Sequence, residues 1–274
     1  MKKYILTFFV FTIIGTHLVA QDKEVKDIFA IERSPEPFLF SLSTLTPEDL
    51  KWSIDYSGSY GNEVVGSMGF EGISQQLGVK GYLGSRFTFY GSLALGFPEG
   101  QGVSSAQQVE VIRNLLGGKK YAGWRLGAGL GGRRDFENEY SMLGRVTLEH
   151  MDSKWKFGGN LLFEKEFAED RDAIDIITSL GLHYRIAGNF YGGVETIGED
   201  MEGFWDDKES EGGAKLMVGP SLNLTPNESK FSFSLSGGPV ILATQNEAFN
   251  PGAIRELPKQ SGLLIRARVI FKLI

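Results

Sequence analysis

The chain has 274 residues, no cysteine and a formal net charge of −6. The lack of cysteine excludes disulfides, thiol catalysis, Cys-based metal sites and a lipid-modified N-terminal cysteine. The excess of acidic residues argues against nucleic acid as a partner. Glycine is frequent, at 36 residues or about 13 %, against a usual value of about 7 %.

Residues 1–20 have the features of a secretory signal peptide. Lys2 and Lys3 precede an apolar stretch, residues 4–14, and small residues lead to a cleavage site at Ala20. The apolar stretch is shorter than the about 20 residues of a spanning helix, which argues against a membrane anchor. Cleavage removes two of the 28 Lys+Arg and none of the 34 Asp+Glu, so the mature net charge is −8. We therefore expect an exported protein.

Residues 21–51 form a polar N-terminal segment that contains Pro35 and Pro37 and no strand pattern. Thr46 has the residue type of an N-cap and Pro47 suits the first helical position, so one short helical turn is expected there. This segment either lies in the periplasm or tucks into the end of the domain that follows.

From Trp52 to the end, residues 52–274, apolar and polar residues alternate with period two, which predicts β-strands. In the stretch RFTFYGSLALGF, for example, Phe87, Phe89 and Leu93 share one face. Most of the expected strands are longer than the 9–11 residues that a tilted strand needs to cross a bilayer. About twelve strands are expected, at residues 52–60, 71–83, 86–97, 104–116, 119–132, 138–151, 154–167, 173–186, 189–199, 212–224, 229–242 and 260–273.

Residues 104–116 are the least clear of these segments. Val109, Ile112 and Leu116 would also share one side of an amphipathic helix. Tight turns, such as residues 84–85, otherwise alternate with longer connections, such as residues 61–70, and a helix would break that alternation. The sequence therefore favours a strand, and the alternation is typical of transmembrane barrels with short periplasmic turns and longer outer loops.

The C-terminal stretch GLLIRARVIFKLI places basic residues on one face of a strand and apolar residues on the other. A basic residue on the lipid face costs about 2–4 kcal/mol at mid-bilayer. The strands carry nine basic residues on their polar faces, and placing all nine against lipid would cost up to about 18–36 kcal/mol. That exceeds the ~5–15 kcal/mol that holds a domain together. The charged faces must therefore point inward, Asp55 and Glu110 among them. The predicted lumen-lining residues are Lys80, Arg125, Arg145, Glu149, Lys156, Glu164, Glu166, Asp175, His183, Arg185, Glu195, Lys215, Arg266, Arg268 and Lys272.

A soluble ligand-binding barrel has the same periodicity with the apolar face inward. Twelve long strands would give such a barrel a very wide interior to fill. Aromatic residues such as Trp52, Tyr60, Trp124 and Trp155 also gather near strand ends, as in the girdles of membrane barrels. Both features favour a membrane barrel over a soluble one.

The signal peptide, the alternating strands and the amphipathic last strand resemble those of bacterial outer-membrane β-barrel proteins. The resemblance covers residues 52–274 as architecture, an all-β, antiparallel, up-and-down transmembrane barrel. It implies a location in the Gram-negative outer membrane, with outer-membrane lipid and the outer-membrane assembly machinery as partners. Such proteins often end on an aromatic residue, whereas this chain ends on Ile274.

The sequence predicts no catalytic residue, no metal site and no cofactor. His183 and Ser179 lie four residues apart on one strand, about 13 Å at ~3.3 Å per residue, too far for a nucleophile–base pair. Ser141 or Ser221 would be alternatives, and nothing specifies either. The acidic stretch 199–211 matches no calcium-binding loop.

Three functions remain open. The mixed-charge interior predicts a narrow, porin-like channel or transporter for small polar solutes. The alternative is a structural or docking barrel that binds a protein partner through its outer loops or its N-terminal segment. A lipid-modifying barrel enzyme ranks third.

Overall fold

The computed structural model describes twelve β-strands and one short helical turn. All described residues belong to one compact unit, Ile31–Ile274. The signal peptide and residues 48–50, which follow Pro47 in the predicted helical turn, lie outside the described residues. The described residues are 34, 36–47, 52–62, 65–66, 68–98, 102–117, 122–167, 174–204, 213–244 and 261–273.

The twelve predicted strands are confirmed, with shifts of a few residues at their ends. The segment that the sequence left between strand and helix is the strand β4 (Ser104–Leu116). A 3-10 helix, η2 (Met201–Phe204), follows β9. The other strands are β1 (Trp52–Gly61), β2 (Gly72–Gly84), β3 (Phe87–Phe97), β5 (Gly123–Arg134), β6 (Tyr140–Met151), β7 (Trp155–Glu166), β8 (Asp175–Ala187), β9 (Phe190–Glu199), β10 (Lys215–Leu224), β11 (Phe231–Leu242) and β12 (Gly262–Leu273).

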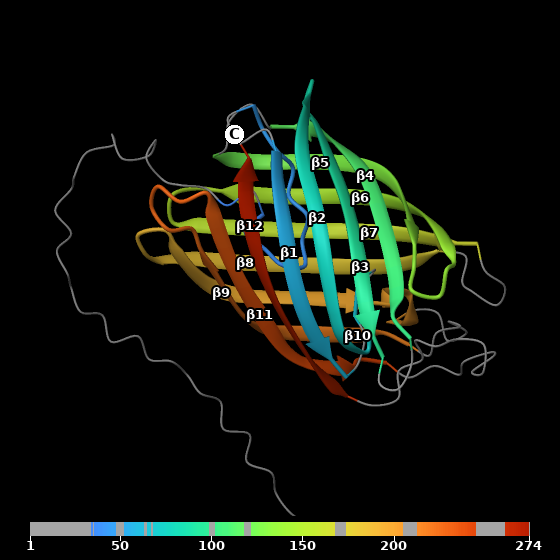
Figure 1. The fold of residues 1–274 in the computed structure, drawn as a ribbon. Helices are drawn as coiled ribbons and strands as arrows, with labels where there is room; N and C mark the ends of the chain where they lie inside the picture. Colours follow the sequence, from blue (N-terminus) through green and yellow to red (C-terminus); the bar gives the residue numbers. More distant parts are fainter. Residues whose placement is uncertain are drawn as a thin grey trace, which may run out of the picture. The chain divides into compact units, whose positions relative to one another are not determined.

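The strands form a closed antiparallel barrel in which each strand pairs with its neighbours in sequence (Figure 1). The last strand closes the barrel against the first, with Trp52 opposite Leu273 and Gly61 opposite Leu264. Closure leaves no sheet edge with unpaired backbone groups, which is the condition for a sheet to cross a bilayer. The predicted all-β, up-and-down barrel is therefore confirmed.

Connection lengths distinguish the two ends of the barrel. The turn end carries the short connections, for example Ser85 and Arg86 between β2 and β3. Both residues have positive φ, at 48° and 69°, as a two-residue type I′ hairpin turn requires. The loop end carries the longer connections, for example residues 62–71 between β1 and β2.

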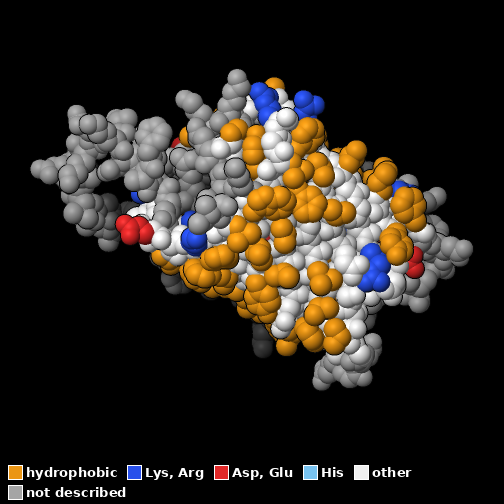
Figure 2. Space-filling view, turned by 45° about the horizontal axis from the view of Figure 1, so that its top comes forward, with side chains coloured by type: hydrophobic (Ala, Val, Ile, Leu, Met, Phe, Trp, Pro, Cys, Tyr) orange, Lys and Arg blue, Asp and Glu red, His pale blue; other side chains and the backbone are white. Residues whose placement is uncertain are grey.

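Outward-facing side chains of the wall are apolar. In β8, Leu180, Leu182 and Tyr184 are exposed while the intervening residues are buried. On the face of the wall in view in Figure 2, hydrophobic side chains are spread widely and few charged side chains lie among them. Arg113, near the end of β4, is an exposed basic residue of the outer face and lies over the Phe87 ring. No helix among the described residues is long and apolar enough to cross a membrane.

Candidate functional site: a plugged barrel interior

Residues 36–46, here called the plug, pass through the barrel interior. Between Glu36 and Thr46 every residue except Phe40 is buried. The plug has no regular secondary structure, so its backbone groups need other partners. Inward-facing side chains of the wall supply them, and the plug is therefore bound as a specific ligand would be.

The backbone of the plug is held mainly by carboxylate and amide groups. The Glu195 carboxylate accepts hydrogen bonds from the backbone N–H groups of Leu39 and Phe40, at 2.8 and 3.0 Å. Asn160 makes a two-way contact with Leu42, accepting from its N–H at 2.7 Å and donating to its C=O at 3.1 Å. Hydrogen bonds to charged groups contribute about 1.5–3 kcal/mol each. These contacts fix the middle of the plug against β7 and β9.

The C-terminal half of the plug bonds to three further strands. Thr44 donates its backbone N–H to Glu149 at 2.6 Å and its hydroxyl to Asn114 at 2.8 Å. The Leu45 N–H donates to the Thr88 hydroxyl at 2.8 Å. The plug is thus joined to β3, β4 and β6 as well.

Phe38 anchors the N-terminal half in an apolar socket. Its ring is fully buried, packs with Met151 and lies 4.6 Å from the His183 ring. Gly158 and Gly181, register partners on β7 and β8, form the floor, and a Cβ on either would collide with the ring. The glycines on this wall therefore make room for the plug.

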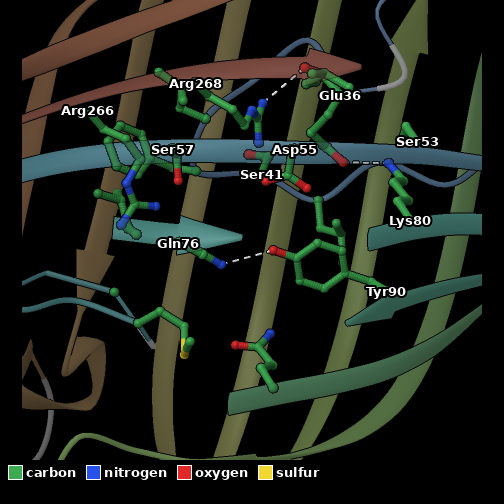
Figure 3. A pocket seen from close by; sticks show the side chains of 18 of the residues that line it. Glu36, Ser41, Ser53, Asp55, Ser57, Gln76, Lys80, Tyr90, Arg266 and Arg268 are labelled. Carbon is green, nitrogen blue, oxygen red and sulfur yellow. Dashed lines mark hydrogen bonds and ion pairs between the residues drawn. The ribbon is translucent and has the colours of Figure 1, made fainter. Parts of the chain in front are cut away.

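Opposite these strands, two long side chains reach across the interior to the plug. Lys80 of β2 forms a buried ion pair with Glu36. Arg268 of β12 donates to the backbone carbonyls of Glu36, at 3.0 Å, and of Phe38. Figure 3 shows both contacts meeting at Glu36.

A cavity of about 100 Å³ lies between the plug and the inner faces of β1, β2, β3 and β12. The side chains of Asp55, Gln76, Tyr90, Arg266 and Arg268 line it (Figure 3). The Gln76 amide donates to the Tyr90 hydroxyl at 3.1 Å. The plug therefore leaves a polar space along one side of the barrel.

On the loop-end side of the plug lies an apolar layer, and buried charged residues such as Glu164 and Lys215 lie beyond it, at the loop ends of β7 and β10. Val65, in the connection between β1 and β2, packs against inward-facing apolar residues, and Phe40 of the plug packs on the same cluster. Phe70 and Phe136 belong to a second, separate apolar cluster, with ring centroids 4.8 Å apart. The interior is thus polar at plug level and closed above it by an apolar layer. The wall residues of that layer are Leu143, Leu162, Ile177, Ile197, Met217, Val240 and Leu264.

The charged residues predicted to line the lumen lie on the inward faces, and several form ion pairs with described residues. Arg125 bonds Glu149 at 2.6 Å, and Lys215 lies 3.3 Å from Glu199. Arg185 is half-buried near the turn end. Arg266 and Arg268 are half-buried beside the cavity. The other predicted residues are buried, with at most 8 % of their surface exposed: Lys80, Arg125, Arg145, Glu149, Lys156, Glu164, Glu166, Asp175, His183, Glu195, Lys215 and Lys272.

His183 has a serine neighbour, and the neighbour is Ser221 rather than Ser179. Its Nε2 lies 2.8 Å from the Ser221 hydroxyl, which donates its one proton to Glu195. His183 must therefore donate to Ser221, the reverse of the direction that activates a serine nucleophile. Because the group is fully buried beneath Phe38, its geometry is that of a plug anchor. Among the described residues, no cluster of three or more His, Asp or Glu is placed to hold a metal ion.

Sequence reasoning missed several interior residues. The sequence does not mark Glu36 as an interior residue, because its segment has no periodicity. Arg133 lies one residue beyond the predicted end of its strand, and in the structure it pairs with Glu164 at 2.5 Å. Gly158 and Gly181 could have indicated the plug from the sequence. Both fall on inward-facing positions of strands, and a glycine there often marks the close approach of another segment.

The fold is similar to that of solved outer-membrane channels. A KdgM porin in complex with disordered oligogalacturonate matches with a TM-score of 0.54 at 10 % identity, over 81 % of this chain and 99 % of that one. An outer-membrane channel from Pseudomonas putida F1 matches with a TM-score of 0.54 at 11 % identity, over 86 % and 99 %. The NanC porin matches with a TM-score of 0.52 at 13 % identity, over 80 % and 100 %.

No known protein family and no curated protein matches the sequence. The resemblance to bacterial outer-membrane β-barrel proteins is confirmed at the level of the fold. At these identities the structural matches establish the fold and no shared substrate.

Proposed function

We propose that this chain is an outer-membrane channel for small polar solutes whose resting state is closed by its own N-terminal plug. The observation that carries the proposal is the placement of the plug. Glu149, Asn160 and Glu195, together with the glycine socket, hold it against β6 to β9, and Lys80 and Arg268 bind it from β2 and β12. A polar cavity lies on that second side. Displacing the plug would join this cavity to the turn end of the barrel.

The apolar layer around Val65 is the second barrier on the proposed path. Hydrophobic constrictions stop ions and polar solutes by excluding water. Val65 belongs to a connection rather than to a strand, so its displacement would leave the strand pairing intact. Opening would therefore require movement of the plug and of Val65, and would leave the twelve strands in place.

The proposal includes export and membrane contact. The apolar outer wall would lie against outer-membrane lipid after insertion by the assembly machinery, and the signal peptide would be cleaved near Ala20. Sequencing the N-terminus of protein isolated from the membrane tests this part, with Gln21 as the expected first residue.

A reversible lock tests the channel. The Ser41 hydroxyl of the plug and the Ser179 hydroxyl of β8 are 3.0 Å apart, close enough for a disulfide after replacement of both by cysteine. The natural chain has no cysteine, so the pair forms without competitors. We expect single-channel openings in planar bilayers with a reductant present, and their loss on oxidation.

The matched control is Ser59→Cys with Ser74→Cys, a directly opposed pair on β1 and β2 whose hydroxyls are 2.6 Å apart. Its disulfide joins two wall strands and leaves the plug free, so oxidation should not abolish openings. If the reduced Ser41–Ser179 variant never conducts under any applied voltage, the channel proposal is wrong.

The closed interior favours a second candidate, a docking barrel that binds a protein partner through its outer loops or N-terminal segment. The specific observation is that the plug and the apolar layer both block the lumen. A barrel that stays non-conducting in the reduced state and co-purifies with one stable partner would support this candidate.

A further inference from the structure

The cavity beside the plug contains charged groups that the surrounding chain does not neutralise directly. Three other interior arginines, Arg125, Arg133 and Arg145, have carboxylate partners, as in the two-pronged contact of Arg145 with Glu110 at 2.8 Å. Arg266 differs: it forms no hydrogen bond or ion pair with any described residue. Its guanidinium lies 5.3 Å from the centroid of the Phe40 ring, and its Nε is buried without an acceptor. This cation therefore faces the cavity with hydrogen-bonding capacity unused.

Arg268, two residues along the same face of β12, adds a second positive charge. It binds neutral acceptors, the backbone carbonyls of Glu36 and Phe38, and its Nε is also buried without an acceptor. The fork of a guanidinium suits a carboxylate, which it binds through two parallel hydrogen bonds. The two arginines thus present a carboxylate-binding edge on one side of the cavity.

Asp55 of β1 supplies the complementary group. Its carboxylate is buried against Gly78, where a Cβ would collide with it, and it makes no hydrogen bond within the described part of the chain. A buried carboxylate needs a donor. Asp55 lines the same cavity as Arg266 and Arg268 (Figure 3). The cavity therefore offers an acceptor for a hydroxyl or an amino group beside the site for an acid group.

The volume limits the size of the ligand. About 100 Å³ is small beside the about 300–1,000 Å³ of pockets that bury drug-sized ligands. Gln76 and Tyr90 add neutral polar groups to the lining. The size and polarity suit a small polar molecule.

We propose that this cavity binds a small organic acid that also carries a hydroxyl or amino group, with its carboxylate on Arg266 and Arg268 and its hydroxyl or amino group on Asp55. The proposal rests on the proposed channel function, since it names the solute class that would enter beside the plug. A carboxylate that engages Arg268 competes with the plug carbonyls for the same guanidinium. Binding should therefore weaken the hold of β12 on the plug.

Calorimetric titration of the full mature chain in detergent tests the site without any transport measurement. The probe is glycerate, and the controls are glycerol, which lacks the carboxylate, and propionate, which lacks the hydroxyls. We expect glycerate to bind best, propionate more weakly and glycerol not measurably. Arg266→Gln should weaken glycerate binding about tenfold or more, since it removes charge-assisted hydrogen bonds, and Arg266→Lys should restore part of it.

Asp55→Asn should reduce the advantage of glycerate over propionate, while Arg113→Gln, which removes an arginine from the outer wall, should change neither affinity. Heat-shifted gel migration confirms that each variant is folded. The proposal is overturned if glycerate binds no better than glycerol, or if folded Arg266→Gln binds it unchanged. If glycerate binds but the protein never conducts, the channel proposal is refuted and the binding site remains supported. If the protein conducts but glycerate does not bind, the binding site is refuted and the channel proposal remains supported.

Discussion

Removing the Phe38 ring should release the plug without unfolding the barrel. Phe38→Ala empties a socket in which the ring is fully buried between Gly158, Gly181, Met151 and His183. Replacing a fully buried phenylalanine by alanine typically costs about 3–5 kcal/mol. Because the ring belongs to the plug, that cost weakens the docking of the plug in the barrel. Each 1.4 kcal/mol changes an equilibrium constant tenfold. The fraction of molecules with an undocked plug should therefore rise by about two to three and a half powers of ten.

The assay is the rate at which a water-soluble maleimide labels Ser41→Cys, the single thiol in the chain, in membrane vesicles. Labelling requires the plug to leave the interior, so its rate follows the undocked population when undocking is fast compared with reaction. We expect Phe38→Ala to accelerate labelling by at least a hundredfold. Phe157→Ala is the matched control, because Phe157 lies on the outward face of β7 and is half-buried. Equal labelling of the two variants would refute the assignment of Phe38 as the anchor.

Three further predictions follow from the same contacts. Glu195→Gln replaces a carboxylate oxygen that accepts from two plug N–H groups, and should raise the open probability in planar bilayers at unchanged single-channel conductance; an unchanged open probability would contradict the role of Glu195. Gly181→Val should expel the Phe38 ring and give the same rapid maleimide labelling, whereas Gly144→Val, where a Cβ meets only open space and one contact at 3.9 Å, should not; slow labelling of both would mean that the socket tolerates a larger floor. Leu161→Arg places a cation at the middle of the outer face of β7 and should lower the free energy of unfolding in lipid vesicles by about 2–4 kcal/mol, with Leu161→Phe as control; a neutral effect would argue against a lipid-facing wall.

The strands and their inward faces were predictable because alternation and the cost of lipid-facing charge are local properties of the sequence. Arg266, Arg268 and Lys272 show this, since their even spacing along one strand determines a common face whatever the rest of the chain does. The pairing of each strand with its sequence neighbours then follows from the short turns.

The plug was not predictable from the sequence because its contacts are long-range and irregular. The hydrogen bond between Leu39 and Glu195 joins residues 156 positions apart, and no periodicity marks the plug partner. The apolar layer was hidden for another reason: inward-facing residues such as Leu143 and Ile177 look the same in a sequence as lipid-facing ones. The sequence left the plug with two possible locations, and the side-chain contacts of residues 36–46 are what place it inside the barrel.

The most direct test of the central claim is whether the plug occupies the barrel interior in the membrane. The measurement is the yield of the disulfide in the Ser41→Cys, Ser179→Cys double variant, in isolated cell envelopes that have never met detergent, determined by mass spectrometry of the linked peptides. The structure predicts near-complete formation on mild oxidation, because the two native hydroxyls are in hydrogen-bond contact. A chain with an intact barrel, no linked peptide and a plug thiol that maleimide labels freely would contradict it.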